Sequence, residues 1–291
     1  MKLFFPIPIY FSIFISIFIS CSSVFYHPTN QTYYTPEQMG FKKQERIFTT
    51  SDGTKLYSWL IHSYQKEVKG NILQLHGNGQ NMTAHFLSLV WLANQGYNLY
   101  TYDYRGYWKS EGEPNPKDIH NDTVEFINTV NAECLKRNEK LILYGQSLGG
   151  AILMRVISDL KNKENISLVI VDGGFPSYKK LAKQIAEKNL IWPIKYLANI
   201  IISDSYSPED YIEKISPLPM IIIHGDADDV VPFNNGKEIF RLAKDPKQFW
   251  EIKGGGHVDW MKLGVSQNAK VFLKLLDQHM EEGNQGSDSF N

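Results

Sequence analysis

The sequence predicts an α/β fold in which helices cover both faces of a mostly parallel sheet. Short apolar runs, most of them ending near a glycine or an aspartate, recur along the chain, and only the last is more polar: "NILQLHG", "YNLYTYDY", "KLILYG", "SLVIVDG", "PMIIIHG" and "QFWEIKG". Strands that are apolar throughout are typical of a parallel sheet buried on both faces. Segments with helical spacing alternate with them, as right-handed crossovers require. These helical segments are 83–94, 119–135, 149–160, 235–243 and 258–280.

An antiparallel hairpin is expected before the first parallel strand. The runs "ERIFTT" and "KLYSWLIHS" are rich in residues that favour strands, and the stretch "SDGT" joins them. The pair Asp52-Gly53 between two such runs is a strong hairpin signal. The main domain is therefore expected to span 41–280, with this hairpin at its start.

Residues 175–217 interrupt the alternation of strands and helices. Two helical stretches, "YKKLAKQIAEKNL" and "IWPIKYLANII", surround Pro193, and no strand-like run occurs there. We interpret 175–217 as a short helical lid inserted over the carboxyl-terminal edge of the sheet, where sites collect in such folds. The alternative is one long crossover with an extra helix. The polar stretch 281–291 is predicted to be a disordered tail.

The first residues differ in character from the rest of the chain. Residues 1–20 carry one charge followed by an apolar run, and small Ser20 stands just before Cys21. This resembles a bacterial lipoprotein signal peptide, which implies that Cys21 is acylated and that an exported protein is anchored in the cell envelope. The alternative is an uncleaved signal anchor, because the run is nearly long enough to span a membrane. Polar residues 21–40 would then form a tether.

Composition limits the classes of protein that remain. The chain has 291 residues, of which 43% are hydrophobic and 21% charged. This is a globular composition that can form a sizeable core. A formal net charge of -1 provides no field for nucleic acid, so no nucleic-acid partner is expected. Two cysteines are too few for a disulfide framework, and Cys134 is expected in the core.

A G-x-S-x-G motif stands at Gly145, Ser147 and Gly149, between a predicted strand and a predicted helix. A tight structural turn would also favour small residues here. In this context, however, the motif is typical of a nucleophile held on a sharp turn. Side chains two residues before and after the serine would collide, so both positions favour glycine. The amides at the start of the helix would stabilise negative charge on a reacting carbonyl.

A serine nucleophile needs a base, and the base needs an acid to orient it. His257 lies in the glycine-rich stretch "GGGHVDW" after the last predicted strand, although a surface histidine would fit there too. The stretch "IIIHGDADDVVP" offers Asp226, Asp228 and Asp229 at the end of a strand. The chain order of serine, aspartate and histidine is that of one known arrangement of the triad.

The loop "LHGNGQN" after the first parallel strand is the candidate for the second half of an oxyanion hole. Gly77 and Gly79 allow close approach of the backbone, so Asn78 could present its amide opposite that of Leu148. His76 is expected to satisfy backbone groups of the loop and not to act as a base.

The motifs "HGNGQN", "YDYRGYWKSEGEP", "YGQSLGG", "HGDADDVVP" and "GGGHVDW" together resemble the α/β-hydrolase superfamily. They are most similar to its serine aminopeptidase-like and lysophospholipase-like group, which includes Bem-type hydrolases, over about 45–280. The resemblance implies that Ser147 is the nucleophile and His257 the base. The family spacing H-G-x-x-D-x-x-V-P selects Asp228 as the acid, and Asn78 and Leu148 become the oxyanion donors.

Two departures from the family pattern leave alternatives open. Trp108 replaces a glycine that is usual in the family, and its indole could narrow the mouth of the site, line an acyl groove or pack under the lid. Asp172 ends the strand after the nucleophile strand, where some α/β-hydrolases carry their acid. Arg105 in "YDYRGY" is expected to pair with an acid or a carbonyl.

The expected reaction is acyl transfer to water through an acyl-enzyme, with a small acyl-ester or lipid-like substrate. No cofactor is required and no metal is expected, because the histidines lack ligand spacing with a carboxylate cluster. One alternative is a serine aminopeptidase-like peptidase, for which acidic lid residues are available. These are Glu187, Asp204, Glu209 and Asp210. The other alternative is a membrane-tethered binding protein that has lost turnover. The sequence does not predict the oligomeric state.

Overall fold

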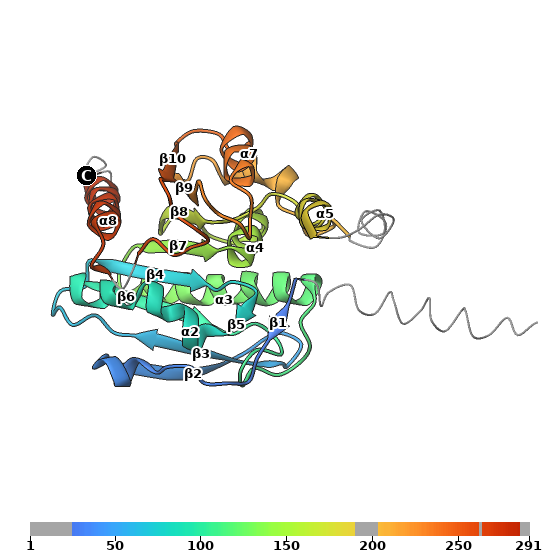
Figure 1. Ribbon diagram of the computed structural model, residues 1–291. Coiled ribbons are helices and arrows are strands. Elements are labelled where there is room, and N and C mark those ends of the chain that lie inside the picture. The colour runs from blue at the N-terminus through green and yellow to red at the C-terminus, as the bar shows by residue number, and fades with distance from the viewer. Residues whose placement is uncertain (1–24, 190–202, 262–263, 286–291) are drawn as a thin grey trace, which may run out of the picture.

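The protein is built around one twisted, mostly parallel sheet, as a computed structural model shows (Figure 1). The structure describes residues 25–189, 203–261 and 264–285. Among them, eight strands form the main sheet in the order β10-β9-β8-β7-β4-β6-β3-β2. Their bounds are β2 Lys43–Thr49, β3 Lys55–Ile61, β4 Gly70–Leu75, β6 Tyr97–Tyr102, β7 Leu141–Gln146, β8 Ile166–Asp172, β9 Met220–Gly225 and β10 Lys247–Ile252.

The strand pairing confirms the predicted fold class. Neighbouring strands from β10 to β6 pair in parallel, whereas β2, β3 and β6 pair antiparallel. The hairpin predicted around Asp52-Gly53 is the β2–β3 pair. The α-helices are α2 Met82–His85, α3 Pro116–Lys136, α4 Leu148–Val156, α5 Tyr178–Asn189, α7 Asn234–Leu242 and α8 Gln267–Gln285. The 3-10 helices are η2 Pro36–Met39, η3 Phe86–Ser88, η4 Val90–Gln95, η5 Ile157–Asp159 and η6 Glu209–Ile215.

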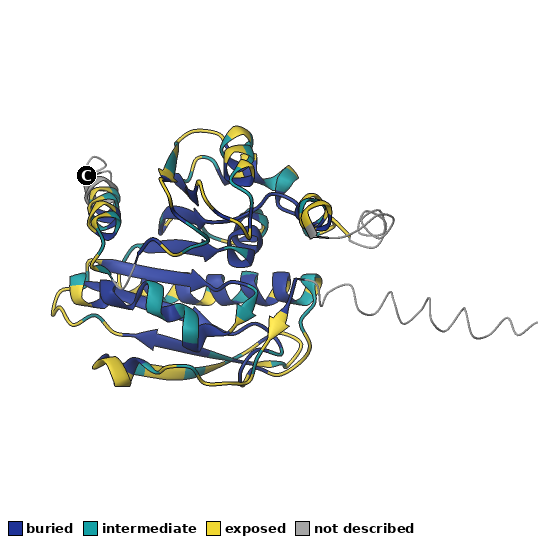
Figure 2. Cartoon of the chain, in the orientation of Figure 1, coloured by how far each residue is buried: buried dark blue, intermediate teal, exposed yellow. Residues whose placement is uncertain are grey.

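Helices cover both faces of the sheet, and its central strands are buried on both sides (Figure 2). Along β8, Val169 and Val171 belong to the core that also contains residues of α3, α4 and α7. Leu168 and Ile170 point to the opposite core, where Phe272 of α8 packs. This alternation explains why the strands read as continuous apolar runs.

Two predicted helices differ from those in the structure. The segment 83–94 forms α2 followed by η3 and η4 instead of one helix. The side chains of Gln74 and Ser88 both donate to the carbonyl of His85, which would accept the amide of Leu89 in an α-helix. The Leu89 amide bonds Phe86 instead. The segment 258–280 begins as a loop, and α8 starts only at Gln267.

The expected tether over 21–40 is wrong for residues 25–40. This segment lies on the domain, where the short parallel strand β1 (His27–Pro28) pairs with β5 (Gly79–Gln80). Phe25 and Tyr26 are buried in the core that also contains α4. The reason is apolar burial, since the aromatic rings of the segment gain more from packing than an open tether could.

Within the predicted lid, the structure describes 175–189 and 203–217. These two segments contain α5 and η6 and no strand. The stretch "IWPIKYLANII" lies outside the described residues. The predicted disordered tail is wrong for 281–285, which continue α8, and 286–291 are not described. No helix within the described ranges is both long and apolar enough to cross a membrane, and 1–20 are not among them.

Candidate active site

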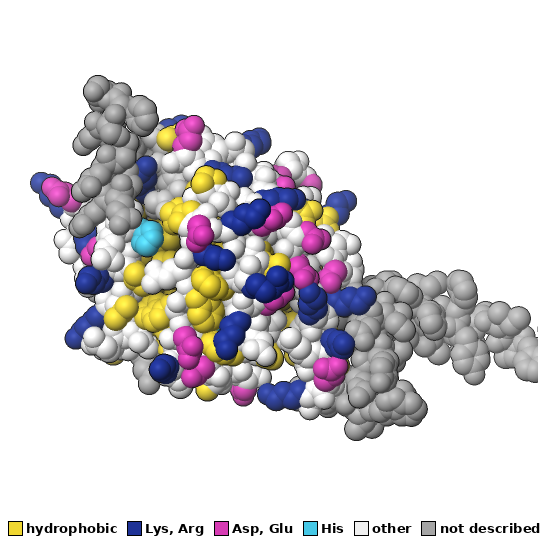
Figure 3. All heavy atoms as spheres, turned by 90° about the horizontal axis from the view of Figure 1, so that it is seen from above, with side chains coloured by type: hydrophobic (Ala, Val, Ile, Leu, Met, Phe, Trp, Pro, Cys, Tyr) yellow, Lys and Arg dark blue, Asp and Glu magenta, His cyan; other side chains and the backbone are white. Residues whose placement is uncertain are grey.

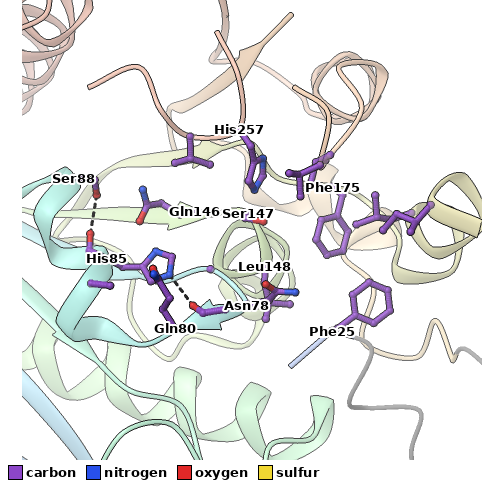
Figure 4. A pocket seen from close by; sticks show the side chains of 18 of the residues that line it. Phe25, Asn78, Gln80, His85, Ser88, Gln146, Ser147, Leu148, Phe175 and His257 are labelled. Carbon is purple, nitrogen blue, oxygen red and sulfur yellow. Dashed lines mark hydrogen bonds between the residues drawn. The ribbon is translucent and has the colours of Figure 1, made fainter. Parts of the chain in front are cut away.

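Ser147 stands on the sharp turn between β7 and α4, at the carboxyl end of the sheet (Figure 4). Its backbone has φ 52° and ψ -115°, a conformation that costs free energy for any residue with a side chain. A Cβ atom at Gly145 would lie 2.5 Å from the Gly149 carbonyl oxygen. One at Gly149 would lie 2.2 Å from the Leu75 carbonyl oxygen. Both glycines are therefore required by the turn, as the motif predicts.

His257 and Asp228 meet at the ends of two neighbouring strands. The loop after β9 carries Asp228, and the loop after β10 carries His257, with 2.7 Å between Nδ1 and Oδ2. The other oxygen of Asp228 accepts the amides of Val230 and Val231. Burial opposes ionisation of Asp228, but hydrogen bonds from His224 and His257 outweigh it and hold the pKa well below its usual range. Asp228 is thus a carboxylate beside the imidazole.

The other acids of the same loop turn away from His257. Asp226 accepts the amide of Gly254 at 2.6 Å, and its side chain is exposed. Asp229 is exposed as well, and its carbonyl accepts from Lys188. Of the three neighbouring aspartates, Asp228 is the one that bonds the histidine, which agrees with the family spacing.

Asp172, the alternative acid, forms its hydrogen bonds with residues other than His257. Its Oδ2 accepts from the Tyr144 hydroxyl at 2.6 Å and from the Trp260 indole at 3.0 Å. Burial raises the pKa of Asp172 to about 6, although both hydrogen bonds favour its charged form. No hydrogen bond joins Asp172 to His257 among the described residues.

The two residues proposed as oxyanion donors both line the cavity beside Ser147. Leu148 is the first residue of α4, and Asn78 lies in the loop after β4. Within the described ranges, neither amide donates to another group. The carbonyl of Asn78 accepts from the Tyr107 hydroxyl at 2.6 Å and from the His27 amide at 3.1 Å. These bonds hold the peptide that follows Asn78, next to the peptide that carries the Asn78 amide.

The cavity around Ser147 has a volume of about 490 Å³. Phe25 and Phe175 lie on one side of Ser147, whereas His85, Ser88 and Gln146 lie on the other (Figure 4). The lining of the cavity also includes the apolar residues Leu148, Leu181, Ile185, Val230 and Val231. One end of the cavity is therefore suited to a hydrocarbon group and the other to a polar group.

His257 lines the same cavity, and its ring points towards Ser147 (Figure 4). The Ser147 hydroxyl forms no hydrogen bond within the described part of the chain. Contacts between a nucleophile and its base are often long without a ligand and shorten when substrate binds. The structure thus brings Ser147, His257, Asn78 and Leu148 to one cavity, with Asp228 behind His257.

The two histidines below the oxyanion loop support its backbone. His76 bonds the Gly77 carbonyl at 2.7 Å, so the structural role expected for it is confirmed. His85, which the sequence did not single out, bonds the Gly79 carbonyl at 2.9 Å. Desolvation and the nearby His76 lower the pKa of His85 to about 4, so the ring is neutral. The sequence carries no signal for this role, because the expected helix continues past His85 to residue 94.

Trp108 does not line the cavity, so it neither narrows its mouth nor lines an acyl groove, and among the described residues its ring contacts lie outside the lid. Its φ of +47° is a conformation that favours glycine, the residue of the family pattern at this position. The indole packs edge-on against Tyr57 and Trp59 and donates to the Thr32 hydroxyl at 2.9 Å. Trp108 therefore holds the N-terminal segment on the domain.

Two further expectations concern residues outside the cavity, and both are confirmed. Arg105 pairs with Asp122 at 2.5 Å and with Asp52 at 2.7 Å. Cys134 is a buried free thiol in α3, and burial raises its pKa to about 12. Among the described residues, no cluster of His, Cys, Asp and Glu is arranged to hold a metal ion.

Comparison with known proteins agrees with this architecture. A family model described as serine aminopeptidase, S33, matches residues 66–214. The uncharacterized protein YfhR of Escherichia coli (strain K12) is 35% identical over 238 residues, covering 81% of this chain and 79% of that protein. The chain belongs to the serine aminopeptidase S33 family of α/β-hydrolases. This confirms the resemblance found in the motifs.

More distant members and solved structures extend the S33 comparison. Protein bem46 of Schizosaccharomyces pombe is 27% identical over 232 residues, covering 78% of this chain and 74% of that protein. An esterase from Pyrococcus furiosus superposes with a TM-score of 0.68 at 18% identity, covering 89% and 98% of the two chains. A monoglyceride lipase variant from Saccharomyces cerevisiae gives 0.60 at 20% identity, with coverage of 89% and 98%. These structures show the shared fold, and the family places the chain among hydrolases of esterase, lipase or peptidase type.

Proposed function

We propose that this α/β-hydrolase is a serine esterase that cleaves esters of apolar acyl groups through an acyl-enzyme. The observation that carries the proposal is the 2.7 Å bond between His257 Nδ1 and Asp228 Oδ2 at the cavity that holds Ser147. The strained backbone of Ser147 and the unbonded amides beside it support the same interpretation.

Each residue has one part in the reaction. Asp228 accepts a hydrogen bond from the Nδ1–H of His257, so Nε2 keeps a lone pair for the Ser147 hydroxyl. As His257 takes that proton, Ser147 Oγ attacks the ester carbonyl, and the amides of Leu148 and Asn78 stabilise the oxyanion. His257 then protonates the departing alcohol. In the second half, His257 activates water, which releases the acid and restores Ser147.

The lining of the cavity supports an ester over a peptide with a free amino terminus. Such a peptide carries an ammonium group, which needs a carboxylate partner in a partly desolvated site. No Asp or Glu is among the described residues that line the cavity. Glu187, Asp204 and Glu209 instead pair with Lys183, Ser177 and Lys180. We therefore place an acyl chain against Phe25 and Phe175 and a polar alcohol at the opposite end.

The surface charges and the N-terminus are relevant to the location of the esterase in the cell. Charged side chains of both signs are interspersed around apolar ones on the face seen from above (Figure 3). We propose that Cys21 carries a lipid anchor in the cell envelope, which would hold the cavity close to a membrane because Phe25 follows within four residues. The mass of the mature N-terminus tests this, with diacylated Cys21 expected. An intact Met1 would indicate the signal anchor instead.

A fluorophosphonate probe tests the function, since it forms a covalent adduct only with an activated serine. We expect labelling of Ser147, no labelling of Ser147→Ala, and normal labelling of Ser158→Ala, which replaces a serine that bonds Arg155 and Asp159 and does not line the cavity. A folded protein that does not react would support the binding protein without turnover. A series of acyl esters from acetyl to palmitoyl, run beside aminoacyl amides, defines the substrate class. Faster cleavage of the amides would overturn the esterase proposal.

A further inference from the structure

The segment 25–33 is the part of the N-terminus that contacts the oxyanion loop. We call it the N-terminal strap. Its strand β1 pairs with β5, so that His27 and Pro28 lie opposite Gly79 and Gln80. The strap thus forms parallel backbone pairing with the same short loop that presents the Asn78 amide to the cavity (Figure 4).

A triangle of hydrogen bonds joins the strap to that loop. The Tyr107 hydroxyl donates to the Asn78 carbonyl at 2.6 Å, and the His27 amide donates to the same carbonyl at 3.1 Å. The His27 amide also lies 3.1 Å from the Tyr107 hydroxyl. Two donors on one carbonyl hold the plane of the following peptide and, through it, the loop between Gly77 and Gly79. The direction of the Asn78 amide therefore depends on groups outside the loop.

Three side chains fasten the rest of the strap to the domain. The Trp108 amide donates to the Thr29 carbonyl at 3.0 Å, and the Trp108 indole reaches Thr32. Asn81 also donates to the Thr29 carbonyl, at 2.9 Å. The amide of Tyr33 donates to the Thr83 hydroxyl at 3.0 Å. Because Trp108 occupies a left-handed backbone conformation to do this, the attachment is a built feature and not a loose contact.

The strap also supplies one wall of the cavity. Phe25 lines it and is 7% exposed. Its ring stacks on Phe175 at 6.1 Å between centroids and meets Tyr178 edge-on at 4.9 Å. The Phe25 and Phe175 rings line the cavity, as does Leu181 of α5.

We propose that the N-terminal strap is a working part of the acyl site, which rests on the esterase function proposed above. Tyr107 acts as a positioning residue that sets the Asn78 amide for the oxyanion. Phe25 determines which acyl chains fit. The segment next to the anchoring cysteine thus controls both the rate of acyl transfer and the choice of acyl chain.

The first test removes one hydroxyl from the triangle. Tyr107→Phe is expected to lower kcat about tenfold with KM unchanged, less than the loss of a whole oxyanion donor, about 10²-fold or more. The affinity for a trifluoromethyl ketone, which mimics the oxyanion, is expected to fall by the same factor. Tyr102→Phe is the matched control, because it deletes another buried hydroxyl, one that bonds Thr123 and not the Asn78 carbonyl. Equal kinetics in both variants would overturn the positioning role.

The second test changes Phe25, the residue of the strap that lines the cavity. Phe25→Ala enlarges the apolar end, so kcat/KM is expected to fall severalfold for acetyl and butyryl esters and to move its maximum to longer chains. Phe41→Ala is the matched control, since Phe41 is 8% exposed, lies outside the cavity and belongs to the opposite core. An unchanged chain-length profile in Phe25→Ala would overturn the role of the wall.

Different results would refute the esterase function and the role of the N-terminal strap. Absence of fluorophosphonate labelling in the full chain would remove the esterase function. Labelling of Ser147 in a protein whose Tyr107→Phe and Phe25→Ala variants match their controls would remove only the role of the strap. Should Tyr107→Phe fail to fold, the chain-length profile of Phe25→Ala decides alone.

Discussion

Replacing Asp172 with asparagine is expected to change how the stability of the fold depends on pH while keeping most of the hydrolytic activity. Asp172 is 1% exposed and accepts from Tyr144 and Trp260. Because it does not bond His257, the asparagine variant should keep kcat within about tenfold of the natural protein. Asp228→Asn, which removes the carboxylate from the imidazole, should lose about 10⁴-fold in kcat.

The magnitude of the stability effect follows from the pKa of Asp172. Burial raises this pKa from 3.8 to about 6, so the folded chain holds the proton more tightly than the unfolded chain. The stabilisation is complete below the unfolded value and is lost as pH rises through the folded value. The rise corresponds to about 3 kcal/mol, since one pKa unit is about 1.36 kcal/mol. Asparagine has no proton to lose, so it avoids this loss of stability at neutral pH.

Urea denaturation at a series of pH values measures the effect. We expect the free energy of unfolding of Asp172→Asn, minus that of the natural protein, to increase by about 2 kcal/mol between about pH 4 and pH 7. The pKa of Asp228 is lowered, so this carboxylate stays ionised across this range. A constant difference for Asp172→Asn would refute the reasoning. A loss of activity in Asp172→Asn as large as in Asp228→Asn would make Asp172 the acid.

Three further experiments, two substitutions and one labelling reaction, test the fold. Gly149→Ala forces a Cβ atom to 2.2 Å from the Leu75 carbonyl oxygen, so the melting temperature should fall by about 6 °C or more. A shift of less than about 1 °C would contradict the close approach of these two segments. Arg105→Lys loses the two hydrogen bonds of the guanidinium to buried Asp122 and should lower the free energy of unfolding, measured with urea, by about 3 kcal/mol. An unchanged denaturation midpoint would mean that a single ammonium group suffices. Cys134, with a pKa of about 12, should resist iodoacetamide in the folded protein and react after denaturation, as peptide masses would show.

Local sequence patterns were sufficient to select most of the candidate residues that lie at the cavity. The glycines around Ser147 are required by contacts within a few residues and between adjacent strands, so the motif carries its own geometry. The end of a parallel strand also fixes the sheet edge on which Asp228 and His257 lie. The family spacing separated Asp228 from its acidic neighbours, and the bond to His257 agrees with that choice.

Contacts between distant segments account for the features that the sequence did not predict. The stretch around Phe25 is polar and irregular in sequence, and its attachment depends on Tyr107 and Trp108, more than seventy residues away. The break in the helix predicted at 83–94 depends on Gln74, which lies on a neighbouring strand. Such contacts leave no periodic signal in either partner.

The class of fold, the family and the nucleophile turn could all be read from the amino-acid order, because each depends on periodicity or on glycines at fixed spacing. Three other features became apparent only in the folded chain: Tyr144 and Trp260 bond Asp172, Trp108 holds the N-terminus, and Phe25 lines the cavity. Hydrogen bonds and ring contacts between such remote segments form only once the sheet has set their distance and direction.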